Sequence, residues 1–253
     1  MFVSMLFEGV LALAGFAAGS IASVAGFGIG SVLTPLLAAR VGTRVAVAAI
    51  SIPHVFGTAV RFWLLRGHVD RRTFVWFGMT SAAGGLLGAL LHQAASNRAL
   101  SIILGGLLLF VGCSELTGFM HRVRFGRAAA WIAGAVSGTF GGLVGNQGGI
   151  RSAALLAFDL DKEAFVETAT AVGLIVDAAR MPVYLVTERH DLRRIAPTIA
   201  LAVLAVVAGT LAGWHVLRGV PARRFRAVVA VCYFRSERGC CFTVEHASVR
   251  GAP

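Results

Sequence analysis

The chain has 253 residues, of which 57% are hydrophobic and only 14% are charged, and its mean hydropathy is +0.79. A soluble domain of this length needs far more charge to cover its surface, so the composition excludes that class. The net charge of +11 comes from arginines clustered between apolar blocks, which is typical of membrane-flanking loops and not of a nucleic-acid groove. We therefore predict an all-α polytopic membrane protein that has the lipid bilayer, and no nucleic acid, as its partner.

The apolar blocks are long enough to form helices that cross the hydrocarbon layer, where every backbone amide must be paired within its own segment. The first block lacks the basic start of a cleaved signal peptide, so we expect it to stay in the membrane. About eight spans are predicted in all. The predicted elements of the first half are helices at residues 5–24, 45–65, 73–91 and 99–116 with a short arm at 31–39, and those of the second half are helices at 128–144, 164–186 and 195–216, an arm at 152–158 and a last segment from 225.

The first helix and the arm that follows it are too long to be one span. Residues 5–39 would extend roughly 50 Å as a continuous helix, whereas the bilayer core is about 30 Å thick. The glycine turn at Gly26–Gly30 must therefore break the helix. Non-helical backbone at membrane depth persists only where protein or water satisfies it, so we expect the substrate path here.

An internal repeat is the most informative feature of the chain. The segment Gly15–Gly30 recurs at Gly134–Gly149 with a shift of 119 positions, and the same shift carries Arg61 to Arg180. Duplication is the economical explanation, and duplicated halves are a common plan among transporters. The predicted units are a first membrane repeat at residues 1–120, a basic linker at 121–127, a second membrane repeat at 128–231 and an atypical tail at 232–253.

The number of spans in each half decides how the two halves relate. About four helices in each half, joined by a short linker, predict parallel halves with Arg71 and Arg193 on the same side of the membrane. The basic loops at residues 66–72, 122–127 and 189–194 would then all face the cytoplasm. If the first arm crosses fully, each half has an odd number of spans and the second half is inverted.

The two glycine turns also resemble the sequence motifs of a known family. The segments Ala25–Gly30 and Val144–Gly149 resemble the two signature segments of the sulfite exporter TauE/SafE family, although Gly30-Ser31 stands where the family has a glycine pair. The stretch Glu167–Val172, running on to Asp177, is similar to the helix after the second signature. The resemblance covers roughly residues 10–230. It implies a carrier of sulfur-containing or other organic anions in a bacterial inner membrane, without specifying the substrate.

A broken helix offers free backbone N–H groups and the positive end of a helix dipole to an anion, and glycines allow close approach. Asparagine and glutamine amides can add hydrogen bonds, and an arginine can hold a sulfonate or carboxylate through two parallel bonds. The predicted substrate-binding residues are Gly26, Gly28, Gly30, Gly145, Asn146, Gln147, Gly148, Gly149 and Arg151. We expect the second turn to line a polar cavity near mid-membrane, opposite the first.

The alternative is that the glycines only allow tight helix packing. We prefer this interpretation for Gly15, Gly19, Gly84, Gly88, Gly134 and Gly138, and the binding role for residues 145–151. The string Gly26–Gly30 follows an apolar helix rather than a strand and does not have the spacing of a nucleotide loop.

Four ionisable residues in the apolar helices are candidates for coupling or counter-ion roles. Arg61 and Arg180 either extend to the lipid headgroups or interact with an anion or counter-ion. Asp177 lies one turn before Arg180, so the two can pair, and Asp177 could alternatively carry a coupling proton. His54 either relays a proton or is a hydrogen-bonded packing residue.

Three classes of function compete. A secondary carrier of small anions is favoured, because the sequence shows no Walker loop and movement would use an ion or substrate gradient. A membrane enzyme lacks support, since HExxH, GxSxG and clustered His or carboxylates are not found. A membrane scaffold or assembly protein is the remaining alternative. The sequence predicts no cofactor and no metal site, and it does not predict an oligomeric state.

The end of the chain does not fit the repeat. Residues from Phe225 should mirror the helix at residues 99–116, but the apolar run 227–234 stops at Arg235. Three of the four cysteines also fall between Cys232 and Cys241. We interpret the tail as a change of reading frame near Cys232, with a natural soluble tail as the alternative.

Overall fold

The fold is described by a computed structural model over residues 2–65, 67–117, 127–155 and 162–217, together with residues 158 and 160. The elements in these ranges are helices, as the composition predicted. They are α1 (Phe2–Ala25), α2 (Ile29–Val41), α3 (Thr43–Leu65), α4 (Arg71–Ala94), α5 (Asn97–Thr117), α7 (Arg127–Val144), α8 (Gly148–Leu155), α9 (Lys162–Thr187), α10 (Arg189–Arg194) and α11 (Ala196–Leu217). The predicted linker other than Arg127, the last predicted span and the tail at 232–253 lie outside the described residues.

Six helices of the described part are long and apolar enough to cross a membrane: α1, α3, α4, α5, α9 and α11. These correspond within a few residues to predicted spans. The helix predicted at 128–144 is present as α7, but its apolar part Ala129–Val144 is shorter than a full span. The predicted arms are the short helices α2 and α8, and α8 begins four residues before the predicted arm. Large apolar side chains such as Leu13, Ile102 and Leu204 are exposed, as expected of a surface that faces lipid.

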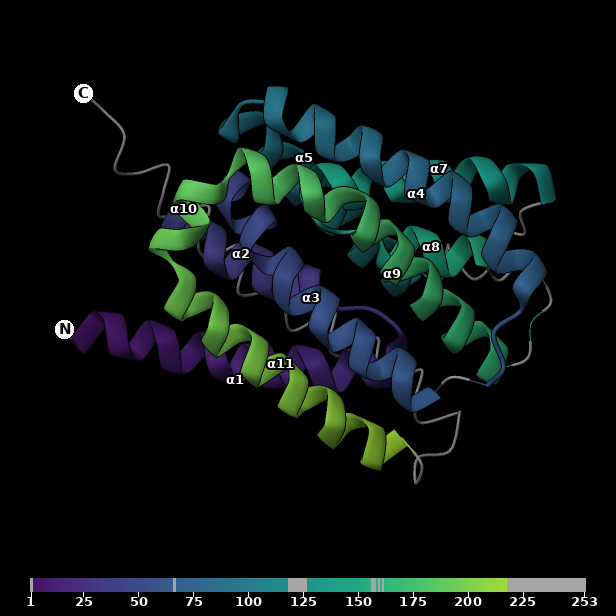
Figure 1. The fold of residues 1–253 in the computed structure, drawn as a ribbon, viewed down its shortest axis with the longest axis horizontal. Helices are drawn as coiled ribbons and strands as arrows, with labels where there is room; N and C mark the ends of the chain where they lie inside the picture. The colour runs from purple at the N-terminus through teal and green to yellow at the C-terminus, as the bar shows by residue number, and fades with distance from the viewer. Residues whose placement is uncertain are drawn as a thin grey trace.

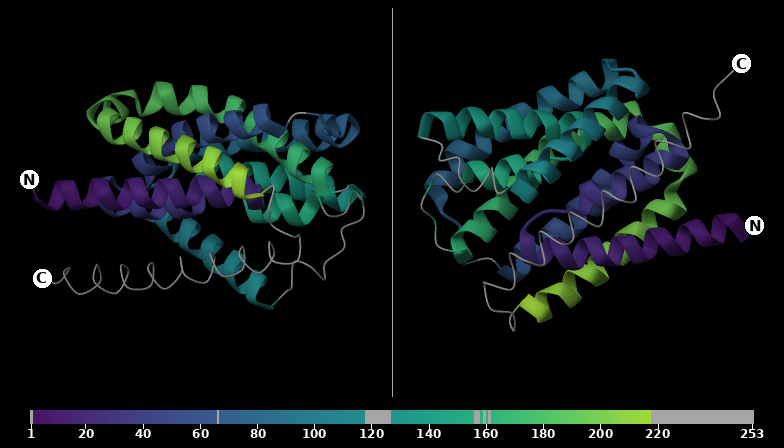
Figure 2. Two further views of the ribbon diagram at one scale, coloured as in Figure 1. Left: turned by 90° about the horizontal axis from the view of Figure 1, so that it is seen from below. Right: turned by 180° about the vertical axis from the view of Figure 1, so that it is seen from behind.

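Two pairs of long helices pack closely, α1 with α11 and α4 with α7, and α3 and α9 lie between these pairs (Figures 1 and 2). A Cβ atom on Gly19 of α1 would meet the backbone carbonyl of Val206 in α11. In the same way, a Cβ on Gly138 of α7 would meet the carbonyl of Ser81 in α4. Glycines therefore let these helix backbones touch, as the packing interpretation predicted for Gly19 and Gly138.

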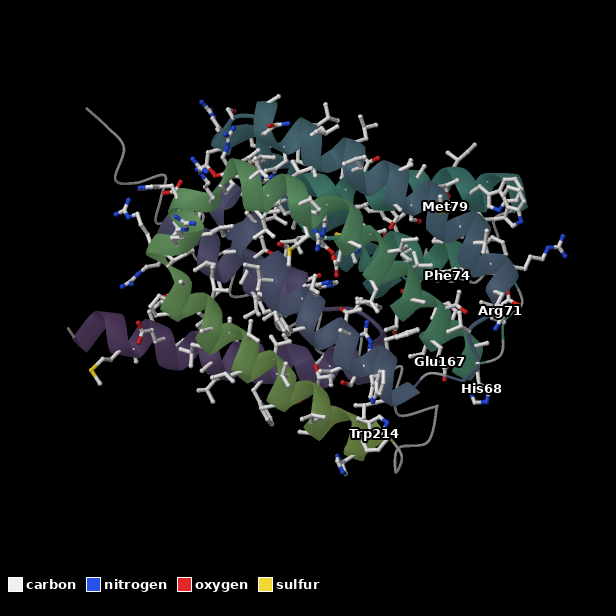
Figure 3. All side chains as sticks on the ribbon, in the orientation of Figure 1. His68, Arg71, Phe74, Met79, Glu167 and Trp214 are labelled. Atoms are coloured by element: carbon white, nitrogen blue, oxygen red, sulfur yellow. The ribbon has the colours of Figure 1, made fainter. Side chains whose placement is uncertain are left out.

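The helices of the two halves run in opposite directions. His54 of α3 contacts Asp177 of α9, and Arg61 contacts Thr170, so α3 and α9 are antiparallel. The end of α3 therefore leads to Arg71 at one end of the molecule, and the end of α9 leads to α10, which carries Arg193, at the other (Figures 1 and 3). The parallel arrangement is wrong, and so is the expectation that the basic loops share one side.

The reason for the inversion is the short helix α2. It takes the chain back across part of the molecule before α3 begins, so α1 and α3 run in the same direction (Figure 1). This fits the alternative in which the first arm counts as a crossing. The duplication itself stays a prediction, although equivalent contacts recur with the shift of 119 positions. Arg61 Nη1 donates to the carbonyl of Ala22, and Arg180 Nη1 donates to that of Gly141.

Candidate functional site

The first helix of each half, α1 and α7, ends at glycines that have a backbone conformation which other residues rarely adopt. Gly26 and Gly28 follow α1 with φ of 82° and 130°, and Gly145 follows α7 with φ of 75°. An L side chain is strained at such angles, whereas glycine is not. The glycines of the sequence motif therefore allow the chain to leave one helix and start the next.

The two breaks lie against each other. Ser31 Oγ donates to Asn146 Oδ1 at 3.2 Å, and Arg151 Nη2 donates to the carbonyl of Gly26 at 3.4 Å. A Cβ on Gly30 would meet the carbonyl of Gly145. Segments more than 100 positions apart in the chain thus form one site, in which Gly30 contacts protein backbone directly.

Gly148 and Gly149 contact other parts of the protein. A Cβ on Gly148 would meet the ring of Phe27 in the first break, and one on Gly149 would lie 2.9 Å from Val111 of α5. Both glycines therefore allow close packing of the start of α8, whatever further role they have.

Arg151 is enclosed by protein, with 2% of its surface exposed. Within the part of the chain that the structure describes, Nε and Nη1 of Arg151 have no hydrogen-bond partner, and neither do Asn146 Nδ2, Gln147 Nε2 and Gln147 Oε1. The hydroxyls of Thr34 and Thr58 are also buried and unpaired. Each buried donor without a partner costs about 1–3 kcal/mol, so this set is suited to a bound group that accepts hydrogen bonds.

Arg61 and Arg180 are buried, with 3% and 1% of their surfaces exposed, so the interpretation that they extend to the headgroups is wrong. Each binds a carbonyl in the last turn of a broken helix, Ala22 in α1 and Gly141 in α7. A cation there stabilises the negative end of the helix dipole. Both arginines therefore hold the ends of helices that stop inside the protein.

Asp177 joins the two halves. Its Oδ1 atom accepts a hydrogen bond from Arg180 Nε at 2.9 Å and forms a salt bridge with Arg180 Nη2 at 2.7 Å, which confirms the predicted pairing. Its Oδ2 atom lies 2.7 Å from His54 Nδ1 on α3. The contact of His54 with Asp177 was not predicted, because no sequence spacing relates residues on separate helices.

The described cluster has more positive than negative charge. Arg61 interacts electrostatically with Arg151 and Asp177, and Arg151 interacts with Asp177 and Arg180. Three arginines against the single carboxylate Asp177 leave two positive charges in excess when His54 is neutral. Buried charge of one sign is costly unless something compensates it, so the cluster favours an anion.

Two hydroxyl residues of the cluster, Thr34 and Thr58, were missed from the sequence. Thr58 lies one turn before Arg61, as Asp177 lies one turn before Arg180, and the shift of 119 positions relates the two pairs. That correspondence was the available signal for Thr58. Nothing in the sequence distinguished Thr34.

Glu167, in the stretch that resembles the family's helix, lies away from this cluster. Its carboxylate contacts His68 at the end of the molecule near Arg71, with 3.2 Å between Oε1 and His68 Nδ1 (Figure 3). Within the described residues, no three His, Cys, Asp or Glu side chains are grouped so as to hold a metal ion.

A family model described as Sulfite exporter TauE/SafE matches residues 11–235, which include both helix breaks and every residue of the cluster. Comparisons with curated proteins and with solved structures gave no match. Members of the matched family are membrane transporters, and the six long apolar helices agree with that assignment. The chain therefore belongs to the sulfite exporter TauE/SafE family and is a multi-pass membrane transporter rather than an enzyme.

Proposed function

We propose that the protein is a secondary transporter that exports or carries small organic or sulfur-containing anions, such as sulfite or sulfonates, across a bacterial inner membrane. The family supports sulfur-containing anions as the substrate class. The site that supports the proposal consists of the two facing helix breaks and the buried arginines beside them.

The observation that carries the proposal is the guanidinium of Arg151. It is buried, positively charged and has two nitrogens without a partner, whereas Arg180 is fully engaged by Asp177 and Gly141. A sulfonate or carboxylate has the paired oxygens that such a group binds through two parallel hydrogen bonds. Amide donors of Asn146 and Gln147 and the start of α2 would complete the coordination of the anion.

The broken helices suggest how the anion could pass. In carriers built from two repeats, discontinuous helices form a site near the middle of the membrane, and the halves rock around it. Gly26, Gly28 and Gly145 provide the joints at which backbone direction changes. Movement of the anion would then be driven by an ion gradient or by the gradient of the anion itself.

The test is anion flux in vesicles that contain the purified chain, screened with sulfite, sulfoacetate, taurine and simple carboxylates. We expect Arg151→Ala to lower flux about tenfold or more while membrane insertion is retained, because truncating one partner of a buried charged contact costs several kcal/mol. Arg151→Lys should keep part of the flux, since it keeps the charge and loses the planar fork.

Arg98→Ala is the matched control, because Arg98 is an exposed arginine on α5. Its flux should equal that of the wild type. Wild-type flux in Arg151→Ala would contradict the proposed site. Wild-type vesicles that move none of the anions would favour the scaffold or assembly alternative.

A further inference from the structure

His54 and Asp177 form a buried contact across the two halves. His54 Nδ1 lies 2.7 Å from Asp177 Oδ2, while Arg180 binds the other oxygen of the same carboxylate through two nitrogens. A carboxylate held by arginine in this way is ionised and accepts a hydrogen bond, so Nδ1 carries the hydrogen. The second ring nitrogen of His54 is therefore the atom that can take up a further proton.

The charges around this ring come from two other helices. Asp177 and Arg180 act on His54 from α9, and Arg151 acts on it from α8. Among the described ionisable side chains of other helices packed against α3, Arg40 of α2, Arg98 of α5 and His215 of α11 are exposed. A proton on His54 is thus attracted by one carboxylate and repelled by arginines, and only Arg151 among these arginines has unpaired nitrogens.

An anion bound at Arg151 would change this balance. Opposite charges attract strongly in an interior of low dielectric, so a bound anion offsets the repulsion that the arginines exert on a second proton. By thermodynamic reciprocity, a protonated His54 must then increase the affinity for the anion by the same factor. The two ligands favour each other's binding.

From this geometry we infer that His54, positioned by Asp177, is the proton-binding site of transport, and that the anion and a proton cross the membrane together. The proton comes from water on one side, binds the second ring nitrogen, and returns to water on the other side. This inference rests on the proposed function and adds the coupling ion to it.

The test uses the full chain in vesicles with sulfoacetate as the probe, because both of its acidic groups stay ionised between about pH 6 and about pH 8. The membrane potential is held at zero with potassium and an ionophore, and the pH is one unit lower outside. One proton for each anion would give about tenfold accumulation of sulfoacetate inside, since one pH unit corresponds to a factor of ten.

The decisive variant is His54→Gln, whose amide can still donate to Asp177 but cannot titrate. We expect it to exchange internal for external sulfoacetate and to lose the accumulation driven by the pH gradient. His190→Gln is the matched control, because His190 is exposed on α10, and it should accumulate the anion as the wild type does.

A second readout is proton uptake when sulfoacetate is added to the purified protein in a weak buffer. We expect about one proton for each bound anion in the wild type, and none in His54→Gln. If the wild type exchanges sulfoacetate but does not accumulate it under the pH gradient, the inference is overturned and the proposed function stands. Loss of exchange in His54→Gln would also overturn it, because that result indicates a structural role. If neither sulfoacetate nor sulfite exchanges in wild-type vesicles, the proposed function fails and this inference falls with it.

Discussion

At the scale of single residues, the partners of each buried arginine decide what it can do. Arg180 donates hydrogen bonds to Asp177 and Gly141, and Arg61 donates hydrogen bonds to Ala22 and Thr170. Among the described residues, the guanidinium of Arg151 makes one hydrogen bond, which is a long one of 3.4 Å to the backbone carbonyl of Gly26. Three side chains of the same type and similar burial therefore differ in function, because their surroundings satisfy them to different degrees.

Asp70 shows a residue with a purely local role. Its Oδ1 atom accepts a hydrogen bond from the backbone N–H of Thr73 at 2.7 Å and so caps the first turn of α4. We expect Asp70→Ala to lower the free energy of unfolding by about 1 kcal/mol, as loss of an N-cap does. Thermal unfolding in detergent would measure this change. Gln93→Ala, at an exposed position of α4, is the control that should leave the midpoint unchanged.

The same cap predicts a dependence on pH. Hydrogen bonds from the Thr73 side chain, and then from its backbone, hold the pKa of Asp70 below its ordinary value. A carboxyl whose pKa is lower in the folded state stabilises the fold fully above its unfolded pKa of about 4, and this contribution is lost as pH falls through the folded value. The stability advantage of the wild type over Asp70→Asn should therefore shrink below about pH 4. If the difference in stability between the wild type and Asp70→Asn grows as the pH falls, this assignment is contradicted.

At the scale of helices, glycine replaces side-chain packing with direct backbone contact. Gly84 and Gly88 of α4 face the carbonyls of Ala135 and Thr139 in α7, just as Gly209 of α11 faces that of Phe16 in α1. Between helices in lipid there is no hydrophobic driving force, so close van der Waals contact has to hold them together. The same pairing of small residues therefore stabilises both outer pairs of helices.

We expect Gly138→Ala to destabilise the protein by about 1–3 kcal/mol, because its Cβ would overlap the backbone of Ser81 and the helices would have to separate. The loss would be measured as a lower unfolding midpoint in detergent. Gly105→Ala is the matched control: Gly105 is a helical glycine of α5, and no atom of the described residues lies within 4 Å of the Cβ that alanine would add. Equal stability of the two variants would mean that α4 and α7 do not touch as described.

At the scale of the whole molecule, the antiparallel crossing of α3 and α9 brings the two helix breaks into one site. Because α2 carries the chain back, α1 and α7 enter the molecule from opposite ends and their broken ends meet inside it (Figure 1). Parallel halves would have placed equivalent helix ends at the same depth and facing the same side. The inverted arrangement instead directs the start of α2 and the start of α8 toward a common point.

This arrangement predicts that Arg71 and Arg193 lie on opposite sides of the membrane. Each would be replaced by cysteine, one at a time, in a chain whose four native cysteines are changed to alanine. A membrane-impermeant thiol reagent added outside whole cells should label one of the two variants, and the other should react only after the cells are opened. Labelling of both from the same side would contradict the inverted arrangement.

Most helices and both helix breaks could be predicted from the sequence, because the bilayer restricts a chain to few structures. Apolar blocks of the required length placed α1, α3, α4, α5, α9 and α11, and glycines between such blocks placed the breaks at Gly26 and Gly145. The pairing of Asp177 with Arg180 followed from their spacing on one helix. These are local properties, so a single segment contains all the information needed.

Only the tertiary structure decided what depends on contacts between distant segments. The sequence could not show whether Arg61 and Arg180 are buried or extend to the headgroups. An arginine near the end of an apolar helix is compatible with either arrangement. It could not show that His54 meets Asp177, that Ser31 meets Asn146, or that the halves run in opposite directions. Such features arise from the way helices pack, and packing depends on the shape of whole helix surfaces rather than on any spacing along the chain.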